Sequence, residues 1–271
     1  MRVTVVHGYF LHDSGSGVYV RELTRALVRL GHEVTLVCQD REPERCDFID
    51  SMYTLDASNE TLTLAYEAPR RMAGSCRLVR PDLDGELLVY AEGEFPPFKR
   101  EHVHAFQNAS VRARERYVAR NVRALRTVFA TWLPELVLAQ HLIMQPYVVA
   151  KALAGRAPYV LTEHGSALNF SVRASEDLVP FALEGLTGAA RIATVSDGAR
   201  DDLVAWAGEQ GLSIAEKIVA MPPGIDGCLF TPAAGREAAL AALNERVELP
   251  VGFEVTAGDD IIAFAGALRP T

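Results

Sequence analysis

The fold follows from the first stretch of the chain, residues 1–37, which reads MRVTVVHGYFLHDSGSGVYVRELTRALVRLGHEVTLV. An apolar strand, Arg2 to Val6, leads through a glycine-containing loop into a segment whose apolar residues recur at helical spacing from Val20 to Leu30. Gly31 is the predicted C-cap of this helix, and an apolar strand resumes at His32. The stretch therefore predicts a β-α-β unit, which joins two parallel strands.

The same alternation returns in the second half of the chain. Apolar runs predict strands at 136–139, 159–162, 192–195 and 218–221. Helical patterns lie between them, at about 111–132, after Pro146, at 178–186 and at 197–207. Strands that are apolar throughout are typical of a parallel sheet covered on both faces. The predicted fold class is therefore α/β, a Rossmann-like doubly wound parallel sheet.

The pattern also predicts how the chain is divided. Residues 1–232 form one domain, interrupted at about 40–100 by an irregular insertion that includes a hairpin strand at 86–90. Residues 233–259 read as a linker helix and loop. Residues 260–271 read as the first strand and loop of a second Rossmann-like domain, and a strand without its following helix cannot bury itself. We expect either a truncated chain or a second component that completes it.

Composition limits the classes of function. The 271 residues are 49% hydrophobic, with a net charge of -8 and a pI near 5.4, which argues against a broad nucleic-acid surface. No run approaches the roughly 20 apolar residues that span a bilayer, and no signal peptide is evident. The four cysteines show no metal or disulfide spacing. We expect a cytoplasmic protein that binds small molecules or proteins, with peripheral membrane contact left open.

The predicted helix at about 111–132 carries six arginines: Arg112, Arg114, Arg116, Arg120, Arg123 and Arg126. We interpret them as a solvated helix face. A binding patch is the alternative.

The loop Gly15-Ser16-Gly17 places small residues just before a helix N-terminus, where free N–H groups and the helix dipole favour a phosphate. A purely structural tight turn is the alternative. Asp40 follows the second strand, the position of the ribose-binding acid in a nicotinamide dehydrogenase. The dinucleotide-binding motif of those enzymes is G-x-G-x-x-G, and here Val20 replaces its last glycine. A dehydrogenase therefore stays open as a third interpretation.

Polar residues follow three strands at the edge where ligands bind in open α/β sheets. They are Gln140 and His141, Glu163 and His164, and Ser196. His164 is a candidate for donating to a substrate oxygen, and a buried histidine that satisfies loop carbonyls is the alternative. For Ser196 a helix-capping role is favoured over a catalytic one. No G-x-S-x-G motif indicates a hydrolase.

Taken in order, these loops resemble the N-terminal half of the retaining GT-B glycosyltransferases of family 4. The matching pieces are Gly15-Ser16-Gly17, Gly31-His32-Glu33-Val34, Gln140-His141, Thr162-Glu163-His164-Gly165, Ala193-Thr194-Val195-Ser196-Asp197, and Pro222-Pro223-Gly224-Ile225-Asp226 with Phe230 and Pro232. Each piece is short, and their order and intervals make the set specific. The match covers most of the chain.

The resemblance implies two Rossmann-like domains facing a cleft, of which this sequence supplies the acceptor-side one. It implies that Gly15, Ser16 and Gly17 approach the phosphate of a nucleotide-diphosphate sugar, that His164 lies near the transferred sugar, and that no cofactor or metal takes part. Gln140, His141, Glu163 and Ser196 are expected to line the acceptor side of the cleft.

The chain departs from the family pattern near its end. Ala267 stands where many relatives have a phosphate-binding arginine, and the paired glutamates of the donor domain are absent. We therefore expect weak or no hexosyl transfer by this chain alone, to an acceptor that the sequence does not identify. The alternative is a non-catalytic subunit that binds a glycan or a partner with the same fold.

Overall fold

The computed structural model describes residues 1–12, 14–90, 102–225 and 235. Apart from residue 235, the predicted linker, 233–259, and the predicted last strand and loop, 260–271, lie outside the described residues. The chain divides into two compact units, Met1–Pro222 and Pro223–Thr271. The first unit is the α/β domain described below.

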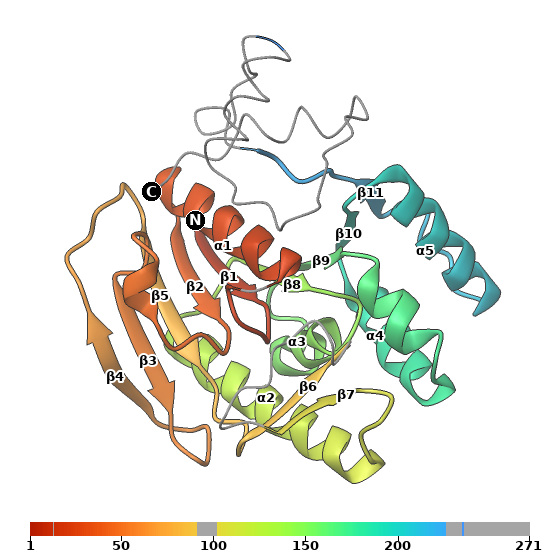
Figure 1. The fold of residues 1–271 in the computed structure, drawn as a ribbon, viewed down its shortest axis with the longest axis horizontal. Coiled ribbons are helices and arrows are strands. Elements are labelled where there is room, and N and C mark those ends of the chain that lie inside the picture. Colours follow the sequence, from red (N-terminus) through yellow and green to blue (C-terminus); the bar gives the residue numbers. More distant parts are fainter. Residues whose placement is uncertain (13, 91–101, 226–234, 236–271) are drawn as a thin grey trace, which may run out of the picture. The chain divides into compact units, whose positions relative to one another are not determined.

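A nine-stranded sheet forms the centre of this domain, with the order β11-β10-β9-β8-β1-β2-β5-β3-β4 (Figure 1). Its strands are β1 (Arg2–Val6), β2 (Glu33–Val37), β3 (Ser51–Leu55), β4 (Leu62–Glu67), β5 (Ser75–Arg80), β8 (Leu136–Gln140), β9 (Tyr159–Glu163), β10 (Arg191–Thr194) and β11 (Ile218–Ala220). Every neighbouring pair is parallel except β3 with β4. The predicted doubly wound parallel sheet is confirmed.

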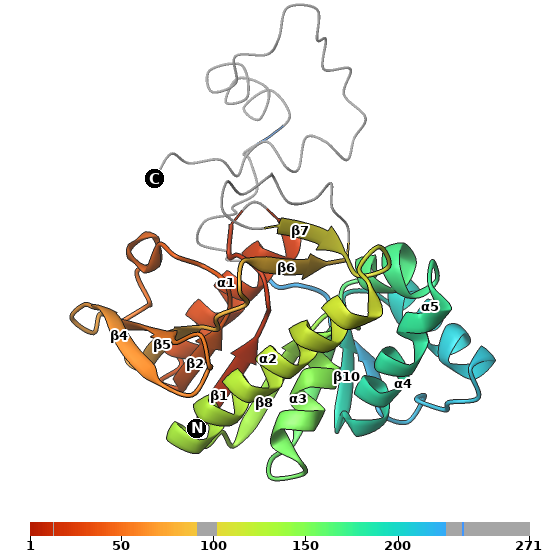
Figure 2. The same ribbon diagram turned by 90° about the horizontal axis from the view of Figure 1, so that it is seen from below.

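Helices cover both faces of the sheet. They are α1 (Gly15–Arg29), α2 (Val111–Thr131), α3 (Gln145–Leu153), α4 (Val179–Gly188) and α5 (Asp197–Glu209), with short helical turns η1 (Pro43–Arg45), η3 (Leu168–Val172) and η4 (Glu176–Leu178). Figure 2 shows α1 on one side of β1 and β2 and α2 with α3 on the other. Each side has its own apolar core, because alternate strand residues such as Val5 and Val6 pack into different clusters. Within the described part of the chain, no helix is long and apolar enough to cross a membrane.

The ends of α1 follow from its sequence. The Ser14 hydroxyl caps the N-terminus by accepting from the Gly17 N–H at 3.0 Å. At the other end the N–H groups of Gly31 and His32 donate to the carbonyls of Val28 and Leu27, and Gly31 has a φ of 86°. This is a Schellman motif, for which glycine is the favoured residue. It confirms Gly31 as the residue that ends the helix.

The segment predicted as an irregular insertion, about 40–100, contains regular strands in its described part, residues 40–90. It supplies β3, β4 and β5, and β5 extends the main sheet by pairing in parallel with β2. Strand β4 pairs only with β3 and is mostly exposed. The irregular sequence pattern has a physical cause, since strands near the edge of a sheet bury fewer residues and need fewer apolar ones.

A strand is present at 86–89, as predicted, but its predicted pairing in a hairpin is wrong. Strand β6 (Glu86–Val89) pairs in parallel with β7 (His102–Ala105) in a separate two-stranded sheet. A parallel pair requires a connection of about a dozen residues or more, and the chain between these strands has that length. A tight hairpin turn is therefore excluded.

The arginines of α2 are not simply a solvated face. Arg114 is only 5% exposed and donates to Asp177 of η4 at 3.0 Å. Arg116 pairs with Glu86, and Arg120 pairs with both Asp82 and Asp84 in the loop between β5 and β6. These ion pairs connect α2 to η4, to the loop after β5 and to the start of β6.

Candidate active site

The predicted site residues lie at the carboxyl ends of neighbouring strands. Gln140 ends β8 and His141 follows it, while Glu163 ends β9 and His164 follows it. Strand β1 lies next to β8, and His7 follows β1. Because parallel strands end at the same edge, these side chains meet there. We call this edge, with the loops that follow β9, β8, β1, β2 and β5, the carboxyl edge.

His164 is held by two neighbours. Its Nε2 lies 3.0 Å from Oε1 of Gln140, which can only accept, so the Nε2 N–H donates to that oxygen. The Tyr19 ring of α1 packs edge-on against the imidazole, with centroids 5.1 Å apart. Burial lowers the pKa of His164 to about 4. The imidazole is therefore neutral at physiological pH, with Nδ1 as a hydrogen-bond acceptor.

His141 is completely buried in a cluster of rings. It lies 5.5 Å from the ring of His7, 4.7 Å from Tyr90, 5.2 Å from Tyr9 and 5.0 Å from His164. Its φ is 66°, a left-handed conformation held by a bond from its own N–H to the Thr162 carbonyl at 2.8 Å. Neither ring nitrogen has a hydrogen-bond partner among the described residues. Burial and the two neighbouring histidines hold its pKa well below the usual range.

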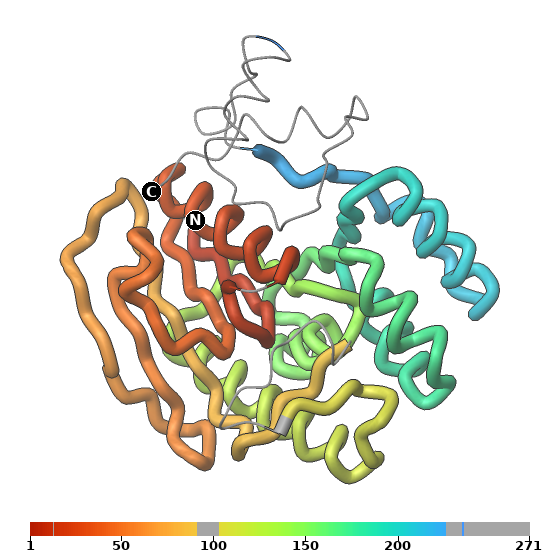
Figure 3. The backbone as a smooth tube through the Cα atoms, in the orientation of Figure 1, coloured from red at the N-terminus to blue at the C-terminus, as the bar shows by residue number. Residues whose placement is uncertain are grey.

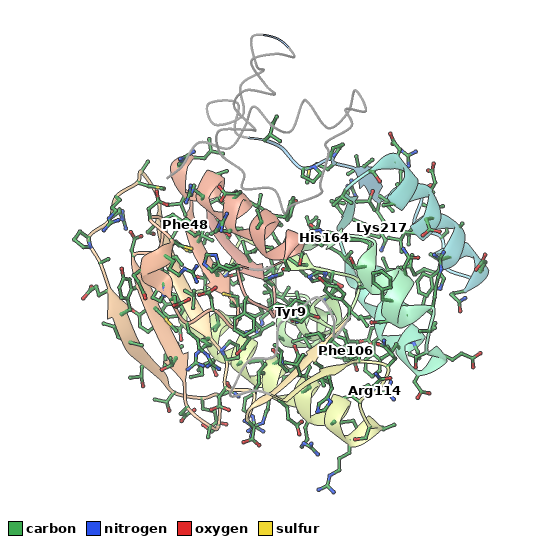
Figure 4. All side chains as sticks on the ribbon, viewed as in Figure 1. Tyr9, Phe48, Phe106, Arg114, His164 and Lys217 are labelled. Carbon is green, nitrogen blue, oxygen red and sulfur yellow. The ribbon has the colours of Figure 1, made fainter. Side chains whose placement is uncertain are left out.

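Three members of this ring cluster, His7, Tyr9 and Tyr90, were missed by sequence reasoning. His7 ends the first strand, and the rule that selected Gln140 and Glu163 could have found it. Its Nε2 lies 3.2 Å from the Phe10 carbonyl, and burial lowers its pKa to about 3. Tyr90 follows β6, which belongs to the smaller sheet, so no strand-order argument could place it. Tyr9 and His164 are labelled in Figure 4.

Glu163 lies beneath the loop that carries His164. It is 1% exposed, and its Oε1 accepts from the Gly165 N–H at 2.8 Å. Burial raises its pKa to about 7, although backbone N–H groups of Gly165, Leu168, His164 and Leu142 act in the opposite direction. Gly165 has a φ of 90°. The carboxyl group therefore shapes the turn from within the protein.

Ser196 caps α5, as its sequence context favours. Its Oγ accepts from the Ala199 N–H at 3.1 Å, and its carbonyl accepts from the Thr194 hydroxyl at 3.1 Å. The hydroxyl is thus already engaged with the helix. Ser196 is separated from His164 by one strand position, since β10 is the neighbour of β9.

The glycine segment lies inside the first turn of α1 rather than before it. Figure 3 shows the chain passing from β1 into α1 through a short connection. A Cβ at Gly17 would lie 2.6 Å from the Phe10 carbonyl oxygen, whereas a Cβ at Gly15 would meet nothing within 4 Å. The Ser16 hydroxyl lies 3.4 Å from that of Tyr90. Gly17 is required for packing, and Gly15 leaves space at the helix N-terminus.

Asp40 fixes the loop that precedes this glycine segment. It is 3% exposed, its Oδ2 accepts from the Leu11 N–H, and its Oδ1 accepts from the Glu42 N–H, each at 3.0 Å. Both carboxylate oxygens already accept backbone N–H bonds within the protein. A ribose-binding role for Asp40, on which the dehydrogenase interpretation depended, therefore has no support in this geometry.

The two glycines give a prediction. Gly17→Ala is expected to lower the free energy of unfolding by about 1 to 3 kcal/mol, because the new methyl group would press on the Phe10 carbonyl. Gly15→Ala is the matched control, and its effect should stay within about 0.5 kcal/mol. Urea unfolding followed by circular dichroism measures both. Equal stability of the two variants would contradict the packing role of Gly17.

The comparisons with known proteins bear on this geometry. The family model described as a glycosyl transferase 4-like domain matches residues 14–224, which is more than half of the chain. The chain belongs to this glycosyltransferase 4-like family. The match contains the α1 N-terminus, the Gln140-His141 strand end and the His164 loop. No curated protein matches the sequence.

The fold of this glycosyltransferase domain is that of the N-terminal half of a GT-B structure. It is similar to sucrose-phosphate synthase from Thermosynechococcus elongatus, with a TM-score of 0.55, 17% identity, and coverage of 92% of this chain and 53% of that one. The α,α-trehalose 6-phosphate synthase from Burkholderia multivorans gives a TM-score of 0.49, 14% identity, and coverage of 90% and 52%. The domain thus spans about half the length of these two structures.

Proposed function

We propose that this chain is the acceptor-side domain of a retaining hexosyltransferase that uses a nucleotide-diphosphate sugar. The observation that supports the proposal most is the packing of Tyr19, from the second turn of α1, against His164. This contact brings the N-terminus of α1 near the imidazole. The proposed phosphate and sugar positions would then lie side by side, as transfer from a sugar diphosphate requires.

The first turn of α1 would stabilise the leaving phosphate. Cleavage of the sugar–phosphate bond builds negative charge on the leaving oxygen, and N–H groups aimed at that charge lower the barrier. The Gly17 N–H is occupied by Ser14, so Gly15 and Ser16 would supply the donors. Gly15 has no Cβ and open space around it, so a phosphate can approach closely.

His164 would orient the transferred sugar. Its Nε2 N–H is directed to Gln140, so Nδ1 would accept a hydrogen bond from a sugar hydroxyl. A neutral imidazole suits this role, because a cation beside a sugar developing positive charge in the transition state would oppose the reaction. We propose transfer without a metal, with charge stabilisation by N–H groups and by a donor-binding domain.

The two solved structures named above are about twice as long as this chain, so we propose that the donor is bound mainly by a second domain. Sucrose-phosphate synthase is covered to 53% by this chain. The isolated 271 residues are then expected to bind acceptor but to turn over weakly or not at all.

The test is nucleotide release from a panel of sugar nucleotides. The 271-residue chain is compared with a chain extended through the downstream reading frame. We expect release by the longer chain, at least 100-fold faster than by the shorter one, because loss of the donor-binding groups removes most transition-state contacts. No release by either chain would overturn the proposal and favour a non-catalytic subunit that binds a glycan or a partner.

A further inference from the structure

A second polar site lies farther along the carboxyl edge. A pocket of about 130 Å³ is lined by residues that end or follow β2, β3 and β5, among them Gln39 and Arg80, together with Phe10. Phe10 belongs to the loop after β1, and its carbonyl contacts His7. The pocket, which we call the Arg80 pocket, therefore adjoins the ring cluster on one side.

The acidic residues of this pocket are already neutralised. Asp82 and Asp84 pair with Arg120 at 3.2 and 3.0 Å, and Glu86 pairs with Arg116 at 3.1 Å. Both arginines come from α2 and lie outside the pocket lining. The three carboxylates are thus each paired with an arginine of α2.

Arg80 differs from these arginines. No oxygen of the described residues forms an ion pair or hydrogen bond with its guanidinium, and its Nε is buried without a partner. An arginine with a buried, unsatisfied N–H is costly unless an acceptor is supplied. Its planar fork matches the two oxygens of a phosphate or carboxylate. The missing component of this pocket is therefore an oxyanion.

We propose that the Arg80 pocket binds a phosphate or carboxylate group of the acceptor. The assignment rests on the proposed function, which places the acceptor at the carboxyl edge. Four strand spacings separate β9, which carries His164, from β5, which ends at Arg80, a distance of about 19 Å across the sheet. The anionic group is thus remote from the reacting hydroxyl, and the acceptor is extended.

The donor phosphate has a different position. The N-terminus of α1 follows β1, two strand positions away from β5. An anion in the Arg80 pocket would thus select the acceptor without competing with the sugar nucleotide. Specificity would come from the charge of the acceptor, since a neutral acceptor would leave the guanidinium unpaired.

Isothermal titration of the 271-residue chain tests this assignment without requiring turnover. The probes are inorganic phosphate, glucose 6-phosphate, glucuronate and neutral glucose. We expect the three anions to bind more tightly than glucose, and Arg80→Gln to weaken their binding about 10- to 100-fold. Arg80→Lys should weaken it less, because the charge remains and the fork is lost.

Arg71→Gln is the matched control, because Arg71 is exposed, precedes β5 and loses the same charge. It should leave anion binding unchanged. Equal binding of glucose and glucose 6-phosphate, retained binding in a folded Arg80→Gln variant, or no anion binding at all would overturn the assignment. Tighter binding of glucose 6-phosphate than of glucuronate would identify phosphate as the group, and the reverse would identify carboxylate. Nucleotide release by the longer chain is measured separately, so the pocket can fail while the proposed transferase activity stands.

Discussion

His164→Ala is expected to lower the kcat of nucleotide-sugar turnover by the longer chain about 100- to 1000-fold while the protein stays folded. Removal of one preorganised hydrogen-bonding group that contacts the transition state typically lowers kcat by this factor. His164 is partly accessible and makes one side-chain hydrogen bond, to Gln140, so its loss leaves the surrounding loop in place. Steady-state kinetics with circular dichroism measure both quantities.

His32→Ala is the control for this experiment. His32 precedes β2, at the opposite edge of the sheet, and its hydrogen bonds to other described residues use only its backbone N–H and carbonyl. The substitution removes the same ring far from the proposed site and should leave kcat unchanged. A folded His164→Ala variant with unchanged kcat would refute the proposed role of this histidine, whereas a rise in KM alone would assign it to substrate binding.

Acid is expected to destabilise the domain steeply below pH 6.5. Burial lowers the pKa of His7 to about 3 and that of His164 to about 4, and it holds the pKa of His141 well below 6.5. A histidine with a lowered folded pKa contributes stability that is present above pH 6.5 and is lost as the pH falls toward the folded pKa. Unfolding therefore takes up protons at these three positions.

Glu163 acts in the opposite direction. Its folded pKa of about 7 lies above the unfolded value of 4.5, so the folded state holds this proton between pH 7 and 4.5. Its contribution falls as pH rises through that window. Near pH 5 the three histidines each take up about one proton on unfolding, and Glu163 releases about one. The net uptake is therefore about two protons. The free energy of unfolding should then fall by about 2.7 kcal/mol per pH unit there.

Urea unfolding between pH 7.5 and 5 checks this slope. The His164→Gln variant should reduce the net proton uptake on unfolding by about one, which makes the slope shallower. His32→Gln should leave the slope unchanged. A wild-type stability that is flat between pH 6.5 and 5 would contradict the assignment of neutral, buried imidazoles.

The sequence was sufficient for the centre of the sheet and insufficient for its edge. Strands such as Leu136–Gln140 are covered on both faces, so this strand is apolar up to Gln140 and its pattern is unambiguous. Leu62–Glu67 is exposed along most of its length, and nothing in its composition separates it from a loop. His102–Ala105 pairs in parallel with the preceding strand, Glu86–Val89, and this pairing depends on tertiary packing rather than on local pattern.

The candidate site shows the same division. Position at strand ends located Gln140, His141 and His164, because parallel topology alone brings such residues together. Polarity could not reveal that Glu163 faces inward, because its burial depends on the backbone N–H groups that surround it. Arg80 ends a strand within the segment predicted as irregular, so no topological rule could assign it to the carboxyl edge.

The position of β1 also bears on how the protein is synthesised. This strand precedes the other strands of the sheet in the chain, yet it lies in the interior of the sheet, with β2 on one side and β8 on the other. Strands β2 to β5 can pair as soon as they leave the ribosome, but the other side of β1 has no partner until residues 136–140 emerge. During that interval a nascent chain presents an unpaired apolar strand edge, the kind of surface that associates with other chains or recruits chaperones. Strand β1, which leads into the ring cluster, therefore stays unpaired on one side until β8 has been synthesised.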